Sequence, residues 1–87
     1  HTGVSGVDGA ARIELIGKPG CHLCDVARQV VEIVSAEMDV DFVERSIFDD
    51  PFLAAEFADA IPVVLVDGAE VGRFRVSAQA IRAALAR

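Results

Sequence analysis

Two cysteines, Cys21 and Cys24, are the only ones in the 87-residue chain and form a Cys-x-x-Cys pair. A loop signal, Lys18-Pro19-Gly20, precedes them, and a long helical pattern follows. At the start of a helix, unpaired backbone N–H groups and the helix dipole favour negative charge. Because the thiolate is the nucleophilic form, we predict a lowered pKa for Cys21 and a role as nucleophile. Cys24, on the first turn, is predicted to be more buried and to resolve a mixed disulfide at Cys21.

Three neighbours of the pair are candidates for tuning or binding. His22, if protonated, would stabilise the Cys21 thiolate and make the pair more oxidising. Lys18, the only lysine in the chain, could stabilise the thiolate or hold a substrate carboxylate. Leu23 offers an apolar contact for a substrate. For each of them an ordinary alternative stays open. His22 could be an exposed polar side chain, Lys18 a solvated charge and Leu23 a packing residue.

The elements that must position the pair follow from the hydrophobic pattern. Strands are predicted over residues 12–16, 40–47, 61–66 and 71–76, with an Asp67-Gly68 turn joining the last two. A helix follows Cys21, with an apolar stripe at Val26, Val30, Ile33, Val34 and Met38 that Val31 and Ala27 widen. A second helix is capped by Asp50 with Pro51 at its first position, and a third is capped by Ser77 and buries Ile81 and Leu85.

The order is strand, helix, strand, helix, strand, strand, helix, which predicts an α/β fold. The first strand–helix–strand unit is expected to be a right-handed parallel crossover, and the hairpin adds an antiparallel pair, so the sheet is mixed. One domain is predicted over residues 10–87. Residues 1–9 are interpreted as a tag remnant or a disordered N-terminus.

Composition narrows the function. Hydrophobic residues make up 53% of the chain and charged residues 25%, which is typical of a folded globular domain. The net charge of −6 argues against nucleic acid as a partner. No apolar stretch approaches the ~18–20 residues of a membrane span. Two cysteines are too few for a disulfide-stapled secreted domain, so we expect a cytoplasmic protein. Nothing in the sequence demands a dimer, and we expect a monomer.

Two segments together resemble the glutaredoxins, and more narrowly the compact bacterial glutaredoxin-like family. They are residues 13–24, with Lys18 and the cysteine pair, and Ile61-Pro62-Val63-Val64 before a Gly-containing hairpin. The resemblance covers residues 11–87. It implies a thioredoxin fold with a four-stranded mixed sheet, ordered second, first, third and fourth strand, and with helices on both faces.

The resemblance also implies a cis Ile61–Pro62 peptide bond and an Ile61 backbone that pairs with an extended substrate. Alternatively, Pro62 merely starts a strand. The chain departs from the family at His22 and Leu23, where glutaredoxins usually carry Pro and an aromatic residue, and after the fourth strand, where an Asp that helps to hold glutathione is absent. As a substitute, the N–H groups of Ser77 and Ala78 could bind a substrate carboxylate, assisted by Arg73 or Arg75.

The sequence therefore predicts a thiol–disulfide oxidoreductase that reduces protein disulfides or glutathione mixed disulfides without a bound cofactor. Glutathione, another low-molecular-weight thiol or a reductase would regenerate the dithiol. The alternative from another class is a carrier of an iron–sulfur cluster or metal with the cysteines as ligands, although a closed zinc site wants four ligands and the pair supplies two. A third possibility is a domain that only docks partners.

Overall fold

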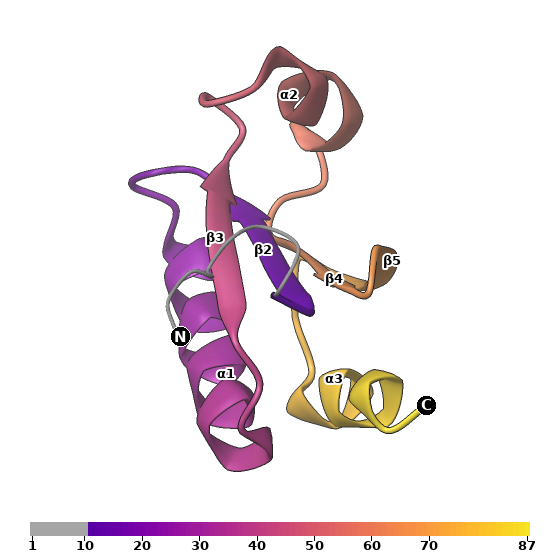
Figure 1. The fold of residues 1–87 in the computed structure, drawn as a ribbon. Coiled ribbons are helices and arrows are strands. Elements are labelled where there is room, and N and C mark those ends of the chain that lie inside the picture. The colour runs from indigo at the N-terminus through magenta and orange to yellow at the C-terminus, as the bar shows by residue number, and fades with distance from the viewer. Residues whose placement is uncertain (1–10) are drawn as a thin grey trace.

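The computed structural model describes residues 11–87, and the predicted tag remnant at 1–9 lies outside the described residues. Seven elements follow one another in the predicted order (Figure 1). They are β2 (Ile13–Gly17), α1 (His22–Met38), β3 (Phe42–Ser46), α2 (Pro51–Phe57), β4 (Val63–Val66), β5 (Ala69–Arg73) and α3 (Ala78–Leu85). No helix among these residues is long and apolar enough to span a bilayer.

The four strands form one mixed sheet in the order β3-β2-β4-β5. β2 pairs with β3 in parallel, and β4 pairs with both β2 and β5 in antiparallel fashion. This confirms the predicted order, in which the first strand along the chain lies between the second and the third. The parallel unit carries α1 in its crossover, so the loop before α1 lies at the carboxyl end of β2.

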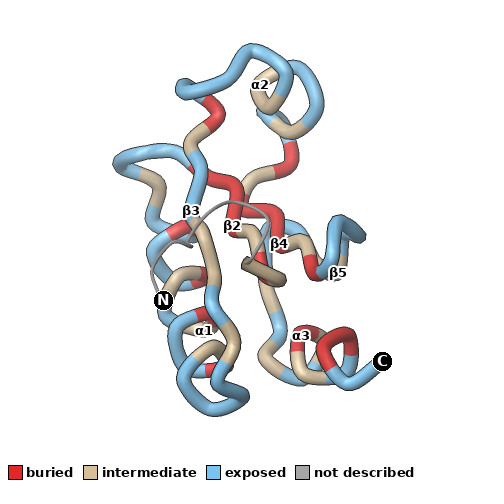
Figure 2. The backbone as a smooth tube through the Cα atoms, in the orientation of Figure 1, coloured by how far each residue is buried: buried red, intermediate tan, exposed pale blue. Residues whose placement is uncertain are grey.

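The sheet has helices on both faces, as predicted. Alternate residues of β2 point to opposite sides: Ile13 and Leu15 pack in the core beneath α1 and α3, whereas Ile16 packs in a second cluster with residues of α2. β4 divides in the same way, with Val64 in the first cluster and Val63 in the second. Figure 2 shows the buried stretches along β2, β4 and the inner sides of α1 and α3. Among the helices of residues 11–87, α2, with 7 residues, is the one that covers the second face.

The buried side of α1 differs from the predicted stripe. The residues that α1 buries are Cys24, Ala27, Val31 and Val34. Of the predicted stripe, Val34 and the two residues that widen it, Val31 and Ala27, are buried, while Val26 is 43% exposed and Ile33 is 61% exposed. Apolar residues occur on more than one side of this helix, so periodicity alone could not select the buried side. The buried series begins at Cys24, which the sequence predicted to be the more buried cysteine.

Strand boundaries also shift from their predicted positions. The last strand ends at Arg73, not Val76, because Phe74 adopts the left-handed conformation (φ 64°) and leaves the ladder. β4 begins at Val63, after the Ile61-Pro62 pair. The predicted helix caps are confirmed: Asp50 accepts a hydrogen bond from the Phe52 N–H, and Ser77 accepts one from the Ala80 N–H.

Candidate functional site

Cys21 is the capping residue at the start of α1. Its backbone is extended (φ −98°, ψ 115°), and its sulfur accepts a hydrogen bond of 3.2 Å from the backbone N–H of Cys24. The two cysteines are joined in a disulfide, with their Cα atoms 5.2 Å apart, a usual separation for such a bond. An N–H group aimed at the Cys21 sulfur would stabilise negative charge there once the disulfide is reduced.

The two sulfurs differ in access, in the way the sequence predicted. Cys21 is half-buried, whereas Cys24 is 0% exposed. Cys24 packs against Gly17, the last residue of β2. A Cβ at position 17 would lie 2.8 Å from the Cys24 sulfur, so only glycine fits without a shift of the neighbouring atoms.

The loop between β2 and α1 is exposed and turns at Gly20, whose φ of +74° is a conformation that glycine adopts at little cost. Lys18 and Pro19 line a hollow of about 230 Å³ on the β3 side of this loop. Arg28 lies in the same hollow and donates hydrogen bonds to Glu44 at 2.8 and 2.7 Å and to Asp25 at 2.9 Å. These bonds, that to Glu44 first, raise the pKa of Arg28. Among the described residues Lys18 forms no ion pair.

A groove of about 360 Å³ lies beside the start of α1. We call it the active-site groove; its lining residues are His22, Leu23, Val26 and Ala27 from α1 and Phe74, Arg75 and Val76 from the segment between β5 and α3. The side chains of Leu23, Val26 and Phe74 are large, apolar and exposed. Exposed apolar side chains that gather in a concave site are suited to hold an apolar group.

The Ile61–Pro62 peptide bond is cis, as the resemblance implied. Ile16 of β2 pairs with Val63, and the antiparallel register therefore places Pro62 opposite Gly17, the residue that contacts Cys24. Pro62 is buried, and its carbonyl oxygen accepts a hydrogen bond of 2.8 Å from the Phe74 N–H. This bond connects the proline to the wall of the active-site groove.

The predicted site residues thus fall into separate positions. His22 and Leu23 share the active-site groove, and Pro62 lies opposite Gly17 in the strand register. Ser77 is exposed and uses its hydroxyl to cap α3 at 3.2 Å. Ala78 is half-buried and packs on the core. Val76, the residue before Ser77, lines the active-site groove. Lys18 lines the other hollow, on the β3 side of the loop.

Sequence reasoning missed three residues of the site. Gly17 was interpreted only as a strand end, although a glycine directly before the loop of a buried cysteine signals close packing. Val26 was assigned to the core, and Phe74 to a strand. An aromatic residue two positions after Gly72 and three before the cap Ser77 could equally have indicated a loop that presents its ring.

Metal ligands are few in the described part of the chain. Residues 11–87 contain no group of three or more His, Cys, Asp and Glu side chains placed to hold an ion. Cys21 and Cys24 are bonded to each other and supply two thiolates at most. A site within one chain would therefore lack ligands for a four-coordinate metal.

The sheet order, the cysteine pair at the start of α1 and the cis proline define a protein of the thioredoxin fold. The chain matches the family described as "Glutaredoxin-like domain (DUF836)" over residues 12–86, and it belongs to that family. It is 37% identical over 81 residues to the uncharacterized proteins Rv0508 of Mycobacterium tuberculosis and Mb0520 of Mycobacterium bovis, an alignment that covers 87% of this chain and 84% of each relative.

Solved structures share this fold. The protein XcR50 of X. campestris superimposes with a TM-score of 0.69 at 28% identity, covering 85% of this chain and 95% of that one. Protein Ne2328 of Nitrosomonas europaea gives 0.71 at 19% identity, with 87% and 92% covered. Thioredoxin 1 of Thermosipho africanus gives 0.60 at 19% identity, with 85% and 93% covered. The last two similarities concern the fold alone.

Proposed function

We propose that this protein is a thiol–disulfide oxidoreductase that reduces protein disulfides or glutathione mixed disulfides. The observation that carries the proposal is the unequal placement of a bonded pair: Cys21 is half-buried at the start of α1, and Cys24 is fully buried on the first turn. One sulfur can meet a substrate while the other stays within reach to complete the exchange.

The proposed cycle is a pair of displacements. The Cys21 thiolate attacks one sulfur of the substrate disulfide, forms a mixed disulfide and releases the other sulfur as a thiolate. Cys24 then loses its proton and attacks the sulfur of Cys21, which forms the Cys21–Cys24 disulfide and releases the second substrate thiolate. Two electrons have passed to the substrate. Two molecules of glutathione or of another low-molecular-weight thiol, or a reductase, return the pair to the dithiol.

The groove and the strand end supply the binding contacts in this proposal. The β4 ladder begins at Val63, so the Ile61 backbone is free of the ladder and can pair with an extended substrate. Leu23 and Phe74 then contact its apolar side chains. A carboxylate of the substrate can bind the N–H groups of Ser77 and Ala78 at the start of α3, while His22 and Lys18 act on the thiolate by charge.

A disulfide-reduction assay tests the proposal, with glutathione and with a thioredoxin-reductase system supplied separately. We expect Cys21→Ser to abolish turnover and Cys24→Ser to keep only glutathione-dependent activity, because a monothiol can still exchange glutathione. Ile33→Ser, on the exposed side of α1, is the matched control and should keep wild-type rates. Wild-type protein that reduces no disulfide with either donor would refute the proposal.

The carrier alternative has its own signature. A cluster shared between two copies through Cys21 would give the purified protein a brown colour and a visible absorption band. A coloured dimer that fails to reduce disulfides would replace the oxidoreductase assignment with that of a carrier.

A further inference from the structure

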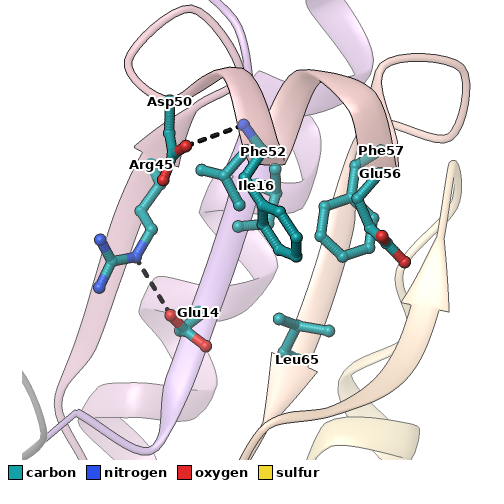
Figure 3. Close-up of a pocket in the computed structure, with 9 residues that line it drawn as sticks. Glu14, Ile16, Arg45, Asp50, Phe52, Glu56, Phe57 and Leu65 are labelled. Atoms are coloured by element: carbon teal, nitrogen blue, oxygen red, sulfur yellow. Dashed lines mark hydrogen bonds and ion pairs between the residues drawn. The ribbon is translucent and has the colours of Figure 1, made fainter.

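The sheet face under α2 carries a second groove, remote from the cysteine pair. It has a volume of about 370 Å³. Its floor is formed by Ile16 and Leu65 of the sheet, and the α2 residues Leu53 and Phe57 contribute its wall. Figure 3 shows the rings of Phe52 and Phe57 directed from α2 toward Leu65. We call this cavity the α2 groove.

Two exposed phenylalanines lie on α2 and in the loop before it. Phe52 lines the α2 groove and is 69% exposed, and Phe48, in the preceding loop, is 71% exposed. α2 itself buries no residue completely. Two phenylalanines this exposed, within five positions of the chain, present apolar area that a partner's side chain can cover.

The charges that α2 and its flanking loops bring to the α2 groove are all negative. Segment 47–62 carries Asp49, Asp50, Glu56 and Asp59 and contains no lysine or arginine. None of these four carboxylates forms an ion pair within residues 11–87. The one cation of the lining, Arg45, is already paired with Glu14 at 3.1 Å. Asp50 and Glu56 line the groove without an ion-pair partner among the described residues, so its α2 side is acidic and favours a cationic occupant.

We propose that the α2 groove is a docking site for a basic amphipathic segment of a partner protein. An aromatic or aliphatic side chain of that segment enters beside Phe52 and Phe57, and its lysines or arginines face Glu56 and the other three carboxylates. α2 and α1 lie on opposite faces of the sheet, so the segment leaves the active-site groove open. The proposal does not depend on the thiol chemistry.

The probe is a short synthetic peptide in which lysines flank a phenylalanine, titrated into the isotope-labelled protein and followed by NMR. We expect saturable shifts at Phe52, Phe57 and Leu65, with an affinity that falls as salt rises. A peptide with glutamates in place of the lysines should bind more weakly. Phe52→Ala should weaken the lysine peptide about tenfold, as loss of an anchor does, and Glu56→Lys about fivefold, as loss of an exposed charge contact does.

Two control variants test whether binding depends on the α2 groove itself or on net charge and exposed apolar area elsewhere on the protein. Glu32→Lys makes the same charge change on an exposed position of α1, and Ile33→Ala removes an exposed apolar side chain there. Both should bind the lysine peptide like the wild type. Equal binding of the two peptides, or shifts centred outside the α2 groove, would overturn the proposal. Self-association of the chain that Phe52→Ala abolishes would also overturn it, since the occupant would then be a second copy.

Discussion

Gly17 and Cys24 are in such close contact that a methyl group on Gly17 would lie 2.8 Å from the Cys24 sulfur and 3.2 Å from its Cβ. Both residues are buried, so neither has open space to move into. We expect Gly17→Ala to lower the free energy of unfolding by about 1–3 kcal/mol, the usual cost of overpacking. Urea unfolding measures this loss.

Gly72→Ala is the matched control for that variant. A Cβ at Gly72 would lie 3.9 Å from the Cα of Val76, which is ordinary contact. This variant should unfold at nearly the same urea concentration as the wild type. If both alanine variants lose equal stability, the close approach to Cys24 is not the cause.

Phe74 has a positive φ of 64°, which costs an L-residue roughly 1–2 kcal/mol relative to glycine. Phe74→Gly and Phe74→Ala both remove the ring, but only the glycine variant removes the backbone cost. We expect Phe74→Gly to be about 1 kcal/mol more stable than Phe74→Ala in urea unfolding. Both should raise the KM for a peptide disulfide, because the groove loses its wall. Equal stability of the two variants would contradict a left-handed Phe74.

His22 follows the capping cysteine directly and lines the active-site groove. A positive imidazole stabilises the Cys21 thiolate and hence the reduced state. We therefore expect His22→Ala to make the reduction potential more negative by up to about 30 mV, a tenfold change in the exchange equilibrium. Equilibration against glutathione redox buffers measures it. A potential equal to that of the wild type would contradict this role of His22.

Asp67 accepts two hydrogen bonds from Arg12, at 2.9 and 2.7 Å, and these bonds lower the pKa of Asp67. A carboxylate with a depressed folded-state pKa contributes stability above its unfolded value of about 3.9, and this is lost as pH falls through the depressed value. Asp67→Asn removes the contribution and tolerates the left-handed turn (φ 52°).

The wild type should therefore have a higher Tm than Asp67→Asn from about pH 7 to 5, with the gap closing below about pH 4. Thermal unfolding followed by circular dichroism at each pH measures the gap. The gap should also shrink in high salt, because both groups are exposed. A gap that persists unchanged to pH 2 would show that the amide disturbs the turn itself.

Local signals were sufficient for most of the fold. Asp50 and Ser77 cap the helices that follow them because their side-chain oxygens accept hydrogen bonds from N–H groups of the first turn. Residue type and position are enough to predict this role. Asp67-Gly68 fixes the hairpin in the same local way. The cysteine spacing likewise indicated which cysteine is the more buried, since that difference follows from their positions at the start of one helix.

What the sequence could not supply depends on contacts between distant segments. Val26 and Val31 are the same residue type on the same helix, and only the position of the sheet decides that Val31 is buried and Val26 lines a groove. Phe74 leaves the strand because its backbone is left-handed, and its N–H bonds to Pro62, twelve residues earlier. The cis bond came from family resemblance, since local preference alone favours trans.

Within residues 11–87 no polar or charged side chain is buried, and this bears on how the buried thiol is activated. In the proposed cycle Cys24 must give up a proton from surroundings that offer no internal carboxylate or imidazole to receive it. The proton acceptor has to be water, a buffer molecule or the departing substrate thiolate. The rate of the resolving step would then depend on the pH of the solution and on how far the start of α1 opens. No internal group would shield the Cys24 thiol from either effect.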